Sequence, residues 1–184
     1  YLSSDAFFWN VTFHEVAHGL GVKETVNGLG PVDVALGNES SVWEEAKADI
    51  LGLYMVCNLI DKGEIPLISK ESAITTYIAS LVRSVRFGAA GAHGRANMMC
   101  YNFLKDNGAF ERNKDGLYHI NYDKVPEVVA AWAELIITTQ ATGNYMFAKE
   151  YDTNHAVVPE ALSADIANVN RGGVPVDIRF EFVW

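Results

Sequence analysis

The chain has 184 residues, of which 49% are hydrophobic and 20% are charged, and its formal net charge is −9 at pH 7. This composition is typical of a globular protein with a hydrophobic core of its own. The acidic balance argues against partners that carry negative charge themselves. We therefore expect no nucleic acid and no membrane among the partners, and the charge leaves the substrate class open.

The first predicted element is a helix that starts after Ser3, Ser4 and Asp5, which are residues that cap helix N-termini. Gly19 and Gly21 mark its end. The residues between are apolar on almost every side. We therefore expect this helix to be buried on most sides.

This helix carries the motif HExxH, with His14 and His18 four residues apart and Glu15 beside them. Two imidazoles at this spacing share a helix face and can reach one metal ion, while the glutamate can accept a proton from a bound water. This stretch alone also allows a structural interpretation, in which the two histidines lie in the core and hydrogen-bond to backbone carbonyls. The motif favours zinc, because buried histidines need partners.

Residues 19–39 are rich in glycine and are predicted to be a loop. Ser41 and Glu44 then form a predicted capping box, which opens a buried helix over 42–62. Glu45 and Asp49 share one face of this helix, so one carboxylate can bind the metal and the other can orient a ligand histidine. The alternative is an exposed acidic first turn, which suits Glu44 better than Asp49.

The rest of the chain is predicted to be mainly helical. The remaining elements are helices over 69–87, 92–106, 126–143, 144–152 and 159–168, a hairpin over 109–122, and a β-rich tail over 174–184. Cys57 and Cys100 lie in apolar helical segments, and we expect both to be reduced thiols of a cytoplasmic protein. The predicted fold class is therefore mainly α, with a short β-hairpin and a C-terminal strand.

Several stretches, in order along the chain, resemble the dipeptidyl peptidase III family of zinc peptidases. They are HEVAHGLG over 14–21, EEAKADILGLY over 44–54, AHGRAN over 92–97, ATGNY over 141–145 and PVDI over 175–178. The likeness is closest to bacterial members and to the peptidase-like part of plant proteins that also carry a Nudix domain. The first two stretches are specific to the family, and the later ones are weaker.

This resemblance implies Zn2+ as the cofactor, with His14, His18 and Glu45 as its ligands. It implies Glu15 as the general base and acid of peptide hydrolysis. The expected substrate is a peptide, from which a dipeptide is released.

The resemblance further implies that Glu44 and Asp49 hydrogen-bond the ligand histidines. His93 corresponds to a family histidine that helps to bind substrate and stabilise the transition state. A family arginine shortly after that histidine is replaced here by Asn97, with Arg95 nearby. We expect Arg95 and Asn97 to contact substrate.

The implied architecture is a helical catalytic lobe. We expect residues 1–184 to be a single zinc-binding domain and the C-terminal part of a longer protein, whose N-terminal lobe completes the substrate cleft. Two alternatives remain open. The chain could be a zinc-stabilised structural or interaction module without activity, or the C-terminal part of a Nudix-type hydrolase.

Overall fold

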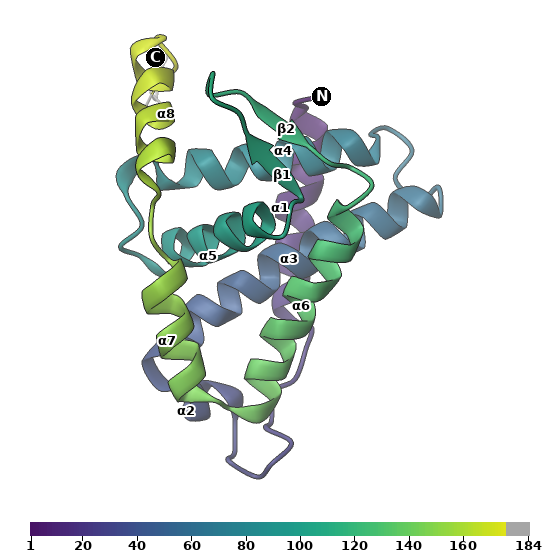
Figure 1. Ribbon diagram of the computed structural model, residues 1–184. Coiled ribbons are helices and arrows are strands. Elements are labelled where there is room, and N and C mark those ends of the chain that lie inside the picture. The colour runs from purple at the N-terminus through teal and green to yellow at the C-terminus, as the bar shows by residue number, and fades with distance from the viewer. Residues whose placement is uncertain (176–184) are drawn as a thin grey trace, which may run out of the picture.

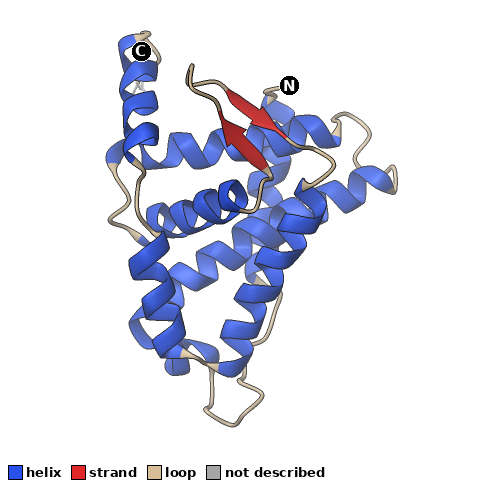
Figure 2. Ribbon diagram, viewed as in Figure 1, coloured by secondary structure: helices blue, strands red, loops and turns tan. Residues whose placement is uncertain are grey.

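The structure, a computed structural model, describes residues 1–175. It is mainly helical, with one small antiparallel hairpin (Figure 2). The elements are α1 (Ser4–His18), α2 (Val32–Leu36), the 3-10 turn η1 (Gly37–Glu39), α3 (Ser40–Asp61), α4 (Lys70–Ser84), the 3-10 turn η2 (Val85–Phe87), α5 (Ala92–Asp106), β1 (Phe110–Arg112), β2 (Tyr118–Ile120), α6 (Val125–Thr142), α7 (Tyr145–His155) and α8 (Glu160–Arg171). The predicted helical fold and hairpin are confirmed. The β-rich tail lies almost wholly outside the described residues.

Helix α1 begins and ends where the sequence predicts. The side-chain oxygen of Ser3 accepts a hydrogen bond from the backbone N–H of Ala6, and Gly19 closes the helix. Its burial differs from the prediction, because Phe8 is 61% exposed and Val16 is 48% exposed. One side of α1, marked by Ala6 and Ala17, packs on α3 and α4, and the described chain leaves its other side open.

The segment that leads into α3 is more ordered than predicted. Part of the expected loop forms α2 and η1, and η1 continues directly into α3 at Ser40. The backbone of Glu39 is already helical, and the N–H of Ser40 bonds to the carbonyl of Gly37. No side chain caps α3, so the predicted capping box of Ser41 and Glu44 is wrong. The Glu44 carboxylate instead faces α1.

Helix α3 is the centre of the molecule, with α1, α5 and α6 packed around it (Figure 1). Trp43 at its start and Trp132 of α6 are fully buried, with ring centroids 6.3 Å apart. Both cysteines are free; Cys100 is buried in this core and Cys57 is half-buried. The burial raises the pKa of the Cys57 thiol to about 11. The core thus anchors α3, which carries the predicted acidic ligand.

The hairpin and α8 meet at the end of the molecule where both termini of the described chain lie (Figure 1). Phe110 pairs with Ile120, and Arg112 with Tyr118. Nε and Nη2 of Arg112 donate hydrogen bonds to the two carboxylate oxygens of Asp165 in α8, at 2.6 and 2.7 Å. The Tyr118 hydroxyl donates a third, at 2.8 Å.

Helices α7 and α8 run past their predicted ends at 152 and 168, to His155 and Arg171. Among residues 1–175, none of the helices has the length and apolar character needed to cross a membrane.

Candidate metal centre

The centre forms where α1 crosses α3, and a glycine sets the distance between the two helices. A Cβ atom on Gly52 of α3 would lie 2.9 Å from the backbone nitrogen of His14 and 3.1 Å from its Cα. No larger residue fits there without moving one helix. Gly52 was not among the predicted site residues, although a glycine inside an apolar helix signals close backbone approach.

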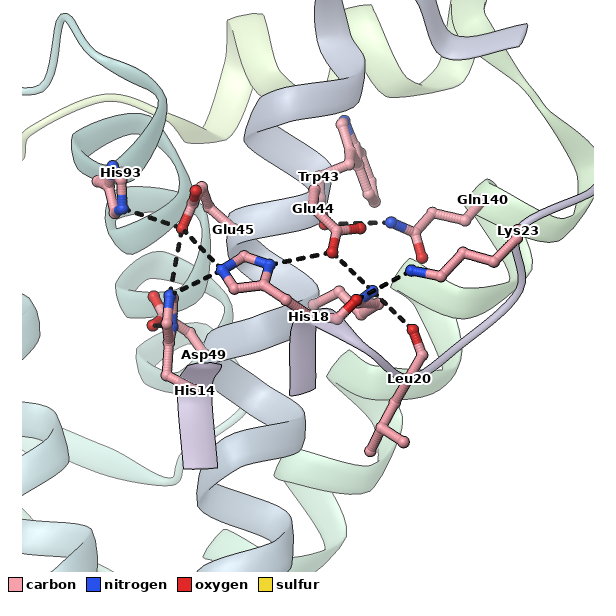
Figure 3. A network of polar contacts seen from close by, with 11 residues as sticks. His14, His18, Leu20, Lys23, Trp43, Glu44, Glu45, Asp49, His93 and Gln140 are labelled. Carbon is pink, nitrogen blue, oxygen red and sulfur yellow. Dashed lines mark hydrogen bonds and ion pairs between the residues drawn. The ribbon is translucent and has the colours of Figure 1, made fainter. Parts of the chain in front are cut away.

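Three candidate ligand atoms converge at this crossing (Figure 3). Nε2 of His14 lies 3.1 Å from Nε2 of His18 and 3.4 Å from Oε2 of Glu45, and the distance between His18 Nε2 and Glu45 Oε2 is 4.0 Å. Bonds of 2.0–2.2 Å to a tetrahedral zinc place neighbouring ligand atoms about 3.3 Å apart. The three side chains therefore fit a zinc ion with small adjustments.

The other ring nitrogens of the two histidines face carboxylates. Nδ1 of His14 lies 2.6 Å from Oδ1 of Asp49, and Nδ1 of His18 lies 3.0 Å from Oε1 of Glu44. Because an ionised carboxylate only accepts hydrogen bonds, these contacts place the proton of each neutral ring on Nδ1. Both Nε2 atoms then present lone pairs to each other and to Glu45. A cation between them removes this repulsion.

Glu45 gives independent support for a bound cation. Its Oε2 atom is buried and receives no hydrogen bond from any residue that the structure describes. Histidine nitrogens of His14, His18 and His93 lie within 4.0 Å of it, without hydrogen-bond geometry. A buried carboxylate oxygen that accepts no hydrogen bond is costly, and metal coordination is one way to satisfy it.

The pKa values of His14 and Glu44 are shifted by their contacts in the centre. The hydrogen bond with Asp49 raises the pKa of His14, although burial opposes it. Burial raises the pKa of Glu44, but hydrogen bonds with Lys47 and His18 outweigh burial and leave the pKa below its ordinary value. Glu44 therefore remains an acceptor near neutral pH.

Lys47 is a neighbour that sequence analysis did not single out. Its side chain is 1% exposed, and its Nζ donates hydrogen bonds to Oε1 of Glu44 at 2.8 Å and to the carbonyl of Leu20 at 2.7 Å. The sequence offered one signal for a buried lysine, because Lys47 stands between two alanines at the start of an apolar run.

His93 at the start of α5 belongs to the same cluster. Its Nε2 lies 3.0 Å from Oε2 of Glu45, and its ring is stacked with that of His14 at 6.4 Å between centroids. Ligand atoms of His14, Glu45 and His93 all lie within 4.8 Å of one another. The His93 side chain is 73% exposed, so solvent and a substrate can reach it.

Glu15 follows His14 on α1 and is exposed. It lies on the open side of the helix, next to the exposed Val16. The side chain is therefore not buried among the described helices, and it is accessible from the side that the described chain leaves uncovered.

Arg95 and Asn97 have partners of their own. The guanidinium of Arg95 donates hydrogen bonds to the carboxylates of Asp152 and Glu39, so it is less free to bind a ligand. The same contacts raise the pKa of the guanidinium. Asn97 is buried and donates to the carbonyl of His93 at 2.6 Å. The structure thus brings seven of the predicted site residues to one helix crossing and engages these two elsewhere on α5.

The chain is similar to known proteins in sequence and in fold. No protein-family model matches the chain. Nudix hydrolase 3 of Arabidopsis thaliana is 33% identical over 181 residues, which are 97% of this chain and 23% of that protein.

Two solved structures match closely. Dipeptidyl peptidase III from Caldithrix abyssi aligns with a TM-score of 0.89 at 33% identity, over 96% of this chain and 34% of that chain. The predicted resemblance to dipeptidyl peptidase III is confirmed. The enzyme from Corallococcus sp. strain EGB aligns with a TM-score of 0.88 at 36% identity, over 97% of this chain and 33% of that chain. The chain therefore spans about a third of these dipeptidyl peptidase III chains.

Proposed function

We propose that this chain is the zinc-binding catalytic part of a dipeptidyl-peptidase-like metallopeptidase. The observation that carries the proposal is the convergence of the Nε2 atoms of His14 and His18 on Oε2 of Glu45, which is buried and accepts no hydrogen bond from the described residues. Two histidines and one carboxylate are the ligand set of several zinc peptidases. The likeness to dipeptidyl peptidase III supports the same reaction class.

In this proposal His14, His18 and Glu45 hold the zinc ion. A bound zinc ion would act as a Lewis acid that lowers the pKa of water, so that the water can give up a proton and attack a peptide carbonyl near neutral pH. Glu15 accepts the proton of the attacking water and returns it to the leaving amine. Its exposed position on α1 leaves it accessible to substrate.

His93 is proposed to contact the substrate at the developing oxyanion, since its imidazole is exposed and adjacent to the ligand cluster. Substrate contacts by Arg95 and Asn97 remain predictions. The contacts of Arg95 favour a further role, which is to tie α5 to η1 and α7.

The peptide cleft is proposed to need more protein than this chain. The ligand cluster lies on an open side, with His93 and Glu15 exposed. We propose that residues 1–184 form one zinc-binding domain and that another lobe of a longer protein closes over it. The two free cysteines fit a cytoplasmic setting.

The test is metal content and peptide hydrolysis of the full-length protein, wild type beside His18→Ala. We expect about one zinc per wild-type chain and dipeptide release that a chelator abolishes. Zinc without hydrolysis would support the structural-module alternative. Absence of metal after zinc is added back would overturn the proposal.

A second proposal concerns the longer protein, because a matching relative is named Nudix hydrolase 3. The full-length protein could hydrolyse nucleoside diphosphate compounds through a part outside this chain. Assays with such substrates, on wild type and Glu15→Gln, test it: activity that survives the substitution would come from outside the zinc centre.

A further inference from the structure

The ammonium group of Lys47 is buried. Removing a charge from water is costly, so the hydrogen bonds of this group must compensate for the lost hydration. Both are short hydrogen bonds, to Glu44 on its own helix and to Leu20 in the segment that follows α1. Lys47 therefore links α3 to the backbone two residues beyond the ligand His18.

One oxygen atom connects this lysine to the metal centre. Oε1 of Glu44 lies 2.8 Å from Nζ of Lys47. The same oxygen lies 3.0 Å from Nδ1 of His18 (Figure 3). The carboxylate is 36% exposed, so without the lysine it has room to turn toward water. An oxygen held by the ammonium group stays in line with His18.

The chain accommodates Lys47 closely on its other side. Gly21 has φ +83, and a Cβ atom there would lie 3.0 Å from Cδ of the lysine. The segment after α1 can pass over the lysine stem because glycine permits both the backbone conformation and the short distance.

The other ligand histidine is oriented differently. Asp49 holds His14 at 2.6 Å, and in the described part of the chain no cation pairs with Asp49. The lysine therefore acts on His18 and not on His14, so its effect can be measured separately from that of Asp49.

From these contacts we infer that Lys47 is a positioning residue of the metal centre: it fixes the Glu44 carboxylate and, through it, the tautomer and orientation of His18. The inference rests on the proposed zinc site. It concerns the strength of metal binding and not the chemical step.

The test compares Lys47→Met with Lys23→Met in the full-length protein. Methionine preserves most of the buried stem. Lys23 is a matched control, because its Nζ donates to the carbonyl of His18 at 2.9 Å, but it is exposed and does not hydrogen-bond Glu44. Zinc dissociation constants are measured by competition with a chromophoric chelator, at a temperature where circular dichroism shows each variant folded.

We expect Lys47→Met to raise the zinc dissociation constant about 10- to 100-fold, as loss of support for a ligand does. Lys23→Met should change it less than about threefold. In a Glu44→Gln background, Lys47→Met should add little, because both changes break one chain of contacts. A purely structural lysine would lower thermal stability and leave the zinc affinity of the folded protein unchanged.

Equal zinc affinity of folded Lys47→Met and wild type would overturn the inference and leave the proposed function standing. A wild type that binds no zinc would overturn both. If Lys47→Met does not fold, NMR of the wild-type protein with 15N-labelled lysine tests the inference instead. The ammonium protons of Lys47 should exchange with water more slowly than those of Lys23 and shift when zinc is added. Equal exchange, or no shift, would overturn the inference.

Discussion

Oδ1 of Asp49 lies 2.6 Å from Nδ1 of His14, and this contact joins α3 to α1 at the candidate metal centre. The contact holds the His14 proton on Nδ1 and turns Nε2 toward His18 and Glu45. It is also the largest cause of the raised pKa of His14.

Asp49→Asn should weaken zinc binding. The amide lacks the charge that stabilises the Nδ1-protonated ring, and it can present a donor where an acceptor is needed. We expect the zinc dissociation constant to rise about 10- to 100-fold. Chelator competition measures it, with Asp61→Asn at the exposed end of α3 as the control. Unchanged affinity would show that His14 needs no orienting carboxylate.

Glu15→Gln should separate metal binding from catalysis. The amide has nearly the same shape but cannot accept a proton, so dipeptide release by the full-length protein should fall at least about 100-fold. Zinc content should stay at the wild-type level, because Glu15 is not among the converging ligand atoms. Glu24→Gln, another exposed site, serves as the control. Retained turnover would exclude Glu15 as the base.

Gly52→Ala should disturb both stability and the centre. The added methyl would lie 2.9 Å from the His14 backbone, so α1 has to move away from α3. We expect a loss of about 1–3 kcal/mol in the free energy of unfolding, as for other overpacked sites, together with weaker zinc binding. Thermal unfolding and chelator competition measure the two effects. Gly91→Ala is the control, since nothing lies within 4 Å of a Cβ there. A fully stable Gly52→Ala variant would contradict the close crossing.

Asp165→Asn should loosen α8 from the hairpin. Hydrogen bonds from Arg112 hold the pKa of Asp165 below its ordinary value of 3.8. A lowered folded-state pKa means that the carboxylate stabilises the fold above the unfolded-state pKa, and that this stabilisation is lost as pH falls through the folded-state pKa. Wild type should therefore exceed the variant in melting temperature by a few degrees at pH 7.

The difference between the two proteins should shrink below about pH 4, and Asp123→Asn, an exposed substitution, should show no such difference. Melting curves recorded between pH 3 and pH 7 test this. A difference that stays constant across the range would contradict an ionic contribution from Asp165.

Local sequence was sufficient for much of the site. The i, i+4 spacing of His14 and His18 and the capping residues of α1 predicted a helix with both imidazoles on one face, and the structure has both. The position of Glu45 and Asp49 on one face of α3 was predicted in the same way. These features follow from helical periodicity, which depends on neighbours a few residues apart.

Other features depended on residues far apart in the chain. The sequence overestimated the burial of α1. An apolar helix indicates that its faces need packing partners, but it does not indicate whether the described chain supplies them. The capping box failed because η1, shaped by its packing on α7, already satisfies the start of α3.

Sequence alone thus predicted that this protein is helical and which side chains are candidate metal ligands. Tertiary structure alone decided that α1 crosses α3 at Gly52 and that Lys47 reaches the centre through Glu44. It also decided that Arg95 is engaged by Asp152. The physical reason is that periodicity and capping act within a few residues. Helix crossings and ion pairs join residues far apart in the chain, such as Arg95 and Asp152, which are 57 positions apart, and their geometry exists only once the core has formed.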